Sequence, residues 1–495
     1  MTMRGAWGAI VALALVGGLV GSPAAAEPNA ARPQAKQAEA DVMDQLIEGA
    51  LGDKPQATID RIDGMIGRTT DKVDRAFLLA LRGAGLLGTG KIDAAVRDFV
   101  DARRLAPDDG LADRIRFIAG LAHDRSDQAA IALDRLLTGP TANVMALDLP
   151  LMAKYLANDD VAKARVDDHR IALAKLNFGG FDGIYIRLGA LRTLLARGRA
   201  AEATALVPGI DEVDAVQRAL IDRRLETMWP TFERGAGPNM ATLIAKNVAD
   251  AEAAFAEDPS NADHRQRLMT VLALARRTTQ VLERGAEIGR TREALASLDE
   301  QQGWVVNRHA LELYRAGRRE DADRRYAELV AANPEKSWIV NMAINRVELL
   351  AQVGNHAAAE KLLPFTEQVG KSFGSPYARQ LIRRMQLCTA IGLKQTSRVP
   401  ALLAELPKFG KDASTATVEG LLCAGDAAGA ERVVLDGLAI EDSRGDYVLL
   451  LQRKPLDPDD PSLWIAAWPG LRARPAIEAA FLAAGRDLPD LYHVK

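Results

Sequence analysis

Residues 76–109 read AFLLALRGAGLLGTGKIDAAVRDFVDARRLAPDD, and this stretch decides the fold. It predicts a helix over residues 77–87, a break at Gly88-Thr89-Gly90 and a second helix over residues 92–105, which Pro107 stops. In the second helix, apolar and charged residues fall on opposite faces, so it packs on one side only. A single hairpin of this kind cannot cover its own apolar face, so copies of it must stack on either side. The expected apolar face carries Ile92, Ala95, Val96, Phe99 and Ala102, and the expected polar face carries Asp93, Arg97, Asp98, Asp101 and Arg104.

The small residues, the aromatic residue and the proline of this segment resemble a known repeat. Gly83, Ala95, Phe99, Ala102 and Pro107 stand at positions 8, 20, 24, 27 and 32 of the 34-residue segment. This spacing is similar to that of the tetratricopeptide repeat. In that family the small residues let the two helices approach, the aromatic side chain fills the space between repeats, and the proline closes the second helix. The resemblance implies stacked helical hairpins and identifies no partner.

Weaker copies of the hairpin follow along the chain. Residues 303–336 match at most of these positions, residues 340–373 keep two small residues but lose the proline, and further turns lie at Gly392 and Gly425. Aromatic residues make up only 5% of the chain, which favours helices over a β-sandwich. We therefore predict an all-α fold, a right-handed α-solenoid of tetratricopeptide-like hairpins over most of residues 41–445 with a C-terminal cap.

Composition changes and an irregular stretch near residues 225–240 divide the chain into five expected segments. A solenoid needs its last apolar face covered, which is the role expected of the final segment. The segments are a signal peptide (1–26), a flexible leader (27–40), an N-terminal helical-repeat region (41–225), a C-terminal helical-repeat region (226–445) and a C-terminal cap (446–495).

The first segment has the three parts of a cleavable export signal. Arg4 supplies the positive charge, residues 7–20 form an apolar run, and the small residues up to Ala26 form a cleavage site. The run is shorter than the about 20 residues that span a bilayer. An uncleaved membrane anchor is the alternative. We expect the mature protein to be periplasmic, with no integral membrane segment after cleavage.

The two cysteines, Cys388 and Cys423, stand 35 residues apart, close to one repeat length. This spacing places them on neighbouring helices, and the expected compartment is oxidising. They form either a disulfide or two buried thiols that behave as small apolar side chains.

The sequence contains no complete enzyme motif. Gly370-Lys371-Ser372 ends like a phosphate-binding loop, but the first glycine of that motif is replaced by Phe365. The six histidines are widely separated and none has metal-ligand spacing to a cysteine. A net charge of −3 gives no field that favours nucleic acid. We predict no catalytic residues, no cofactor and no metal.

The remaining candidate is the concave groove that the first helix of each hairpin lines in tetratricopeptide-like stacks. Amides there suit a peptide backbone, arginine suits a carboxylate, and Trp and Tyr serve as apolar anchors. Family members that clamp a C-terminal carboxylate use Asn and basic residues at several of these positions; Asn345, Arg379 and Arg383 fit, whereas Asn307 stands where lysine is expected. An ordinary solvated inner face is the alternative. The predicted groove residues are Trp304, Asn307, Tyr314, Asn341, Asn345, Arg379 and Arg383.

These observations predict a periplasmic, non-enzymatic scaffold or adaptor that binds a protein or peptide in the groove, in envelope or motility complex assembly. The first alternative is a cell-wall-acting enzyme with a superhelical domain. The second is a purely structural subunit.

Overall fold

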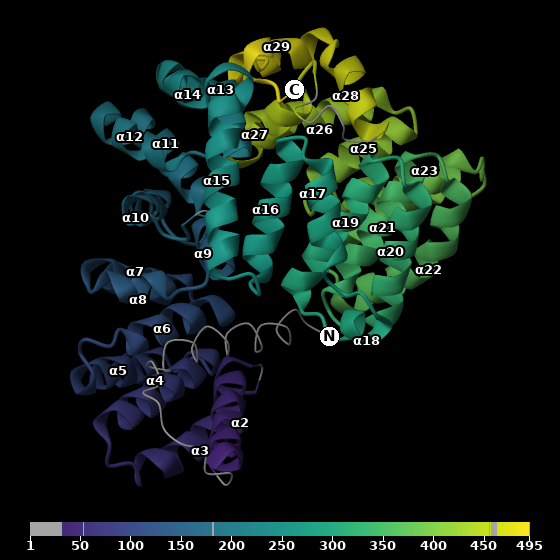
Figure 1. The fold of residues 1–495 in the computed structure, drawn as a ribbon. Coiled ribbons are helices and arrows are strands. Elements are labelled where there is room, and N and C mark those ends of the chain that lie inside the picture. The colour runs from purple at the N-terminus through teal and green to yellow at the C-terminus, as the bar shows by residue number, and fades with distance from the viewer. Residues whose placement is uncertain (1–31, 53, 181–182, 455, 457–462, 495) are drawn as a thin grey trace. The chain divides into compact units, whose positions relative to one another are not determined.

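The computed structural model describes residues 32–52, 54–180, 183–454, 456 and 463–494 (Figure 1). These residues form helices and turns without a strand, and their one β contact is an isolated antiparallel bridge between Asp222 and Gly485. The all-α prediction is thus confirmed for this part of the chain. The predicted signal peptide, residues 1–26, lies outside the described residues.

The chain divides into two compact units, residues 1–210 and residues 211–495. This division precedes the boundary between residues 225 and 226 that the sequence predicts. Unit one contains α2 (Arg32–Leu51), α3 (Gln56–Ile66), α4 (Lys72–Gly88), α5 (Ile92–Leu105), α6 (Leu111–Ala122), α7 (Ser126–Thr138), α8 (Thr141–Met145), α9 (Leu149–Leu156), α10 (Lys163–Lys175), α11 (Ile184–Ala196), α12 (Ala200–Leu206) and the 3₁₀ helix η2 (Val207–Gly209).

Unit two contains the remaining helices. They are α13 (Val213–Ile221), η3 (Arg223–Met228), α14 (Trp229–Ala236), η4 (Pro238–Met240), α15 (Ala241–Glu257), α16 (Ala262–Leu274), α17 (Thr278–Ala286), α18 (Arg292–Ala296), α19 (Glu300–Arg315), α20 (Arg319–Ala332), α21 (Ile339–Gln352), α22 (His356–Phe373), α23 (Pro376–Gly392), α24 (Val399–Glu405), η5 (Leu406–Phe409), α25 (Ser414–Cys423), α26 (Ala427–Ala439), α27 (Glu441–Leu450), α28 (Leu463–Arg472), α29 (Pro475–Ala484) and η6 (Asp490–Tyr492).

The first helix of unit one corrects the expected leader. Helix α2 begins at Arg32, so residues 32–40, predicted to be flexible, are helical. The Ala, Gln, Lys and Glu residues of this stretch are strong helix formers, and Pro33 lies in the first turn, where its missing N–H costs little.

The hairpin of α4 and α5 shows what a small residue does between two paired helices. Helix α5 has the predicted bounds, whereas α4 starts earlier because the Asp71 side chain caps it by accepting from two backbone N–H groups. A Cβ on Gly83 would lie 3.1 Å from the Phe99 ring and 3.2 Å from the Ala95 carbonyl oxygen. Glycine therefore allows α4 and α5 to approach closely, with Phe99 fully buried between them.

Asp98 does not belong to the polar face that the sequence predicts for α5. Its side chain is buried, and Arg82 of α4 donates from Nε and Nη2 to its two carboxylate oxygens at 2.7 Å each. This bidentate pair gives both carboxylate oxygens a hydrogen-bond donor, so Asp98 can be buried although the helix period predicts that it faces solvent. Asp98 thus joins the two helices of the hairpin.

In unit two, α19 with α20, α21 with α22, and α25 with α26 form successive helix pairs. The turns of the first two contain Gly317 and Gly354 with φ of 78° and 75°, a conformation that glycine adopts without strain. Helix α21 also packs on α23, and α23 on α25, so the first helices of neighbouring hairpins touch directly.

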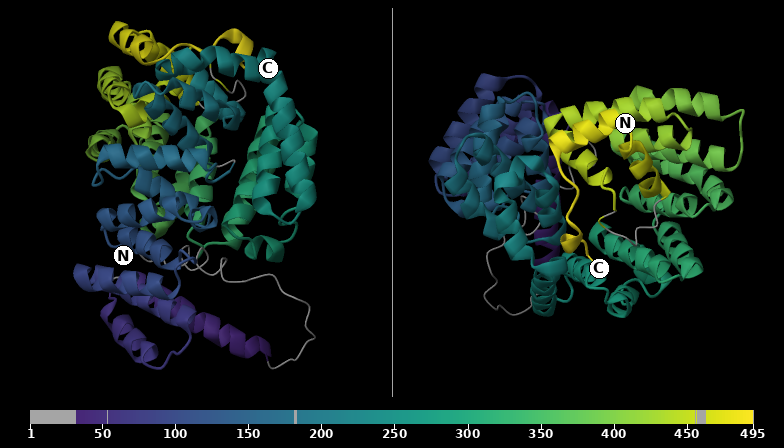
Figure 2. Two further views of the ribbon diagram at one scale, coloured as in Figure 1. Left: turned by 90° about the vertical axis from the view of Figure 1, so that its left-hand side faces the viewer. Right: turned by 90° about the horizontal axis from the view of Figure 1, so that it is seen from above.

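The end of unit two packs against its own beginning. Helix α27 contacts α13, α29 contacts η3, and η6 contacts η4. Figure 2 shows the yellow C-terminal segment beside teal helices from the start of the unit. The same C-terminal segment also covers α26 through α28 and α29. The residues expected to be a cap therefore pack on both the last hairpin and the first helices of the unit.

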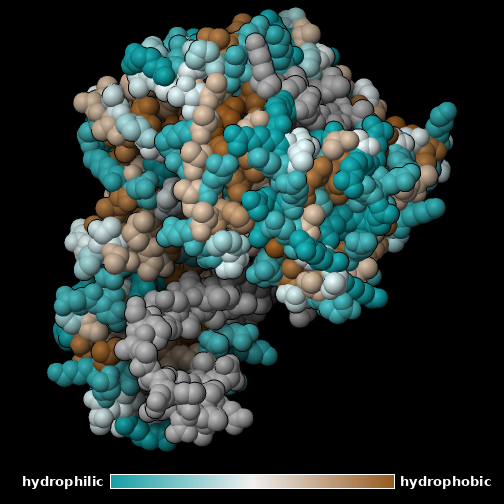
Figure 3. All heavy atoms as spheres, in the orientation of Figure 1, coloured by the Kyte–Doolittle hydropathy of each residue, from teal (hydrophilic) through white to brown (hydrophobic). Residues whose placement is uncertain are grey.

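Hydrophilic side chains cover most of the face seen in Figure 3, and hydrophobic ones lie among them in smaller areas. Among the described helices, none combines the length and the apolar character needed to cross a bilayer.

Candidate functional site

Two of the predicted groove residues meet across neighbouring hairpins. Asn345 of α21 donates from Nδ2 to Oδ1 of Asn307 on α19 at 2.8 Å, and the hydroxyl of the buried Tyr326 donates to the same oxygen at 2.8 Å. Both asparagines are half-buried. Within the described part of the chain, no hydrogen bond engages Nδ2 of Asn307 or Oδ1 of Asn345. The pair therefore offers one amide N–H₂ group and one amide oxygen, which can pair with the C=O and the N–H of a peptide backbone.

The predicted apolar anchors and the third amide lie on the same two helices but do not gather at one point. Trp304, in the second turn of α19, is half-buried and packs against the apolar cluster around Leu298 and Trp338. Tyr314, in the last turn of α19, is buried, with the Arg319 guanidinium 5.4 Å from its ring centre. Asn341 is half-buried in the first turn of α21.

Arg379, Arg383 and Lys371 line a separate, mainly basic hollow of about 120 Å³ between α22 and α23, which the carboxylate of Glu367 also lines. Arg379 donates to the Gly374 carbonyl oxygen at 2.7 Å, and Arg383 lies 3.6 Å from the centre of the Phe409 ring. Burial, and to a smaller extent the charge of Arg379, lower the pKa of Arg383. The hollow can take a small anionic group, but the structure does not bring it together with Asn307 and Asn345.

A charged ladder, not predicted from the sequence, runs along α21, α23 and α25. Arg384 of α23 is almost fully buried; its Nη2 lies 2.8 Å from Glu348 of α21, and its Nη1 donates to Glu419 of α25. Burial raises the pKa of Glu419; at Arg384, burial lowers the pKa, but the attraction of both carboxylates holds it above the usual value. The detectable signal was the spacing of opposite charges about one repeat apart, 35 residues between Arg384 and Glu419.

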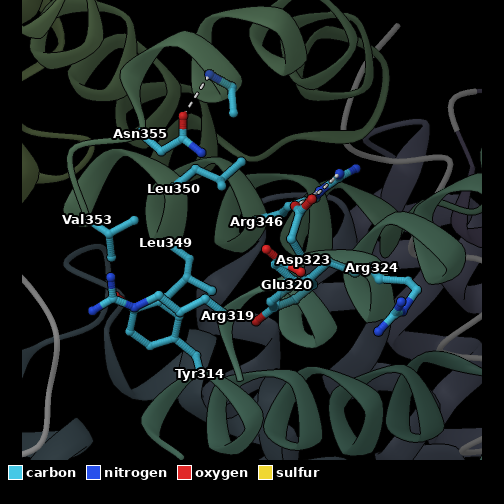
Figure 4. Close-up of a pocket in the computed structure, with 12 residues that line it drawn as sticks. Tyr314, Arg319, Glu320, Asp323, Arg324, Arg346, Leu349, Leu350, Val353 and Asn355 are labelled. Atoms are coloured by element: carbon cyan, nitrogen blue, oxygen red, sulfur yellow. Dashed lines mark hydrogen bonds and ion pairs between the residues drawn. The ribbon is translucent and has the colours of Figure 1, made fainter. Parts of the chain in front are cut away.

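A crevice of about 410 Å³ opens between α20 and α22, with the end of α21 as its floor (Figure 4). Leu349, Leu350 and Val353, at the end of α21, supply the apolar lining of this floor, while the rim is charged. Arg346 of α21 donates from Nε to Asp323 of α20 at 2.7 Å, which fixes one side of the rim. The crevice fits an apolar side chain whose neighbours are charged.

An apolar hollow of about 260 Å³ continues between the same two helices beyond Arg346, which lines both spaces. Its walls include Val330 of α20 together with Leu362 and Phe365 of α22. Arg346 is the one lining residue that the two spaces share. Neither space was predicted from the sequence, because only the first helix of each hairpin was expected to line a groove.

Cys388 and Cys423 are joined by a disulfide, with an S–S distance of 2.10 Å. It links α23 to the end of α25, adjacent first helices whose side chains also meet in the charged ladder. Of the two alternatives that the sequence left open, the structure contains the disulfide.

Gly370-Lys371-Ser372 lies inside α22, where the backbone N–H groups serve the helix and cannot wrap a phosphate. In the described parts of the chain, no three His, Cys, Asp or Glu side chains gather as metal ligands would. No protein-family model matches this chain, and no curated protein sequence is similar to it.

Proposed function

We propose that this protein is a periplasmic, non-enzymatic scaffold or adaptor that binds a protein or peptide, in the assembly of an envelope or motility complex. In this proposal the hairpins build a right-handed tetratricopeptide-like solenoid. The first helices, α19, α21 and α23, line its groove, and an export signal at the N-terminus delivers the chain.

The pairing of Asn307 with Asn345 carries the proposal. One amide N–H₂ and one amide oxygen are left over from this pair, half-buried and on neighbouring first helices. An extended segment that crosses α19 and α21 would satisfy both with its own backbone C=O and N–H. The basic hollow at Arg379 and Arg383 adds a place for an acidic group of the same partner.

Site-specific cross-linking in the periplasm tests this function. A photoreactive residue at Asn341, beside the amide pair on α21, is expected to capture one defined partner. The same residue at the exposed Gln368 of α22 serves as the control and is expected to capture none. Asn345→Ser should reduce stoichiometric co-purification of that partner, whereas Gln368→Ser should not.

Two results would contradict the proposal. One is cleavage of cell-wall glycan by the purified chain with no partner captured, which supports the enzyme alternative. The other is capture that is equal at both positions and unchanged by Asn345→Ser.

A further inference from the structure

Residues 485–489, which follow α29, lie along α13 and α14 as an extended peptide ligand would. The anchor is Arg486: its Nη2 donates to Glu233 at 2.9 Å, its Nε donates to the Leu220 carbonyl oxygen at 2.6 Å, and its guanidinium lies 3.6 Å from the centre of the Trp229 ring. These three groups belong to residues more than 250 positions earlier in the chain. We call this arrangement the arginine socket.

The backbone around the anchor is also bound. The Arg486 N–H donates to the Ile221 carbonyl oxygen at 2.9 Å, in line with the bridge between Asp222 and Gly485. The Gln452 side chain donates to the Arg486 carbonyl oxygen at 3.1 Å and accepts from the Leu488 N–H at 2.7 Å. A carboxamide that pairs with both sides of a peptide backbone is a typical recognition device for an extended segment.

Side chains on either side of the anchor give the segment its specificity. Leu488, two residues after the anchor, is buried. A Cβ on Gly485 would lie 2.6 Å from the Ile221 carbonyl oxygen, so only glycine fits before the arginine. Trp229 is held in place because its indole N–H donates to the Ala219 carbonyl oxygen at 3.0 Å. The bound pattern is therefore Gly-Arg-X-Leu.

We infer that the arginine socket is a peptide-binding site, which residues 485–494 of the same chain occupy and thereby close unit two. Its ligand class is an extended segment with arginine followed two residues later by leucine. The socket lies on α13, η3 and α14, apart from the groove residues of α19, α21 and α23. This inference therefore does not depend on the proposed function.

Tethering explains why the chain's own segment holds the socket. A segment attached to the protein reaches an effective concentration on the order of millimolar, so a free peptide at micromolar concentration cannot displace it. Weakening the attached segment should therefore expose the socket to a peptide added in solution.

The test uses the full chain with Arg486→Ala and Leu488→Ser, and a labelled peptide of residues 484–494. Fluorescence anisotropy should show that the peptide binds this open variant at least about ten-fold more tightly than it binds the wild-type chain, because the tethered competitor has been weakened. A peptide with alanine at the arginine position should lose most of this binding. Adding Glu233→Gln to the open variant should weaken binding of the normal peptide.

Controls keep the outcome interpretable. Circular dichroism establishes that the open variant keeps its helix content, and Gly235→Ala, at an exposed α14 position with nothing near its Cβ, should not change peptide binding. If the double variant fails to fold, Arg486→Lys replaces it, since lysine keeps the charge but loses the planar stacking on Trp229. A folded open variant that ignores the peptide, or that binds the normal and the alanine peptide equally, overturns the inference.

Discussion

The hydroxyl of Tyr155 on α9 donates to Nδ1 of His169 on α10 at 2.6 Å, and both side chains are buried. On its other side, Nε2 of His169 donates to Asp134 of α7 at 2.5 Å. Burial lowers the pKa of His169, although Asp134 opposes this effect, and both ring nitrogens make a hydrogen bond. Three helices of unit one are thus joined through one imidazole.

Tyr155→Phe should destabilise unit one. The substitution leaves Nδ1 of His169 without its donor in a buried place, which costs about 1–3 kcal/mol. Urea unfolding followed by circular dichroism measures the change. Tyr377→Phe, at a largely exposed tyrosine, is the matched control and should stay within about 0.5 kcal/mol. Equal stability of both variants would mean that the hydroxyl does not support the imidazole.

His309 predicts a loss of stability in mild acid. Burial, with smaller contributions from Arg325 and Arg318, lowers the pKa of this buried histidine from 6.5 to about 4. Since the unfolded chain then binds the proton more tightly than the folded chain, stability falls as the pH drops from about 6.5 towards 4.

Between pH 7 and pH 5 this histidine should cost at most about 2 kcal/mol of the free energy of unfolding. His309→Gln removes the proton-binding group. Between pH 7 and pH 5 the free energy of unfolding of this variant should therefore fall by up to about 2 kcal/mol less than that of the wild-type protein. Urea titrations of both proteins at the two pH values give the comparison. Parallel losses would show that another group controls the acid sensitivity.

Ala95→Asp tests the packing of the hairpin in unit one. Ala95 is fully buried against Gly83 and Phe99. An unpaired carboxylate there should lower the free energy of unfolding by about 3 kcal/mol or more. Thermal unfolding should show a much lower melting temperature. Ala201→Asp introduces the same side chain at an exposed position of α12 and should have little effect. An unchanged melting temperature for Ala95→Asp would contradict the close approach of α4 and α5.

Removing the disulfide should destabilise unit two. The bond closes a loop of 35 residues, and the entropy of such a loop in the unfolded chain corresponds to about 4 kcal/mol in the chain-entropy model. The variant with Cys388→Ala and Cys423→Ala should therefore unfold at lower urea concentration than the oxidised protein. Peptide mapping without reductant supplies the direct check. Two free thiols in protein taken from the periplasm would contradict the bond.

The proposed export signal has a simple test. Protein recovered from the periplasm should begin at Glu27, because cleavage is expected after Ala26. Mass spectrometry of the intact chain and of its N-terminal peptide reads this directly. A chain that keeps Met1 would favour the membrane-anchor alternative.

Helix period and turn residues predicted the elements well because they act over short distances. In α5, the run from Ile92 to Leu105 is amphipathic and is bounded by Lys91 and the approach to Pro107, so local sequence sets both ends. The helix period placed Asp98 wrongly on the solvent face, since it cannot show that Arg82 of the neighbouring helix donates to this carboxylate. Residues 32–40 were predicted to be a flexible leader from their composition, although the same residues have high helix propensity.

The candidate sites depended on residues that the sequence places far apart. Asn307 and Asn345 were both named from their predicted repeat positions, but only the tertiary structure shows that they bond to each other. Arg384 escaped notice because its partners Glu348 and Glu419 are each about one repeat away. The signal in the sequence is the spacing: opposite charges stand about one hairpin length apart on successive first helices.

The sequence by itself determined that this chain is helical, that its helices pair into hairpins, and which small residues let them approach. The tertiary structure alone decided that residues 485–494 return to α13 and α14 and that Arg486 finds Trp229 and Glu233 there. The reason is physical. Helix formation follows from side chains within a few turns of one another, whereas the closure of unit two depends on the summed curvature of all the helix packings in between, which no local pattern encodes.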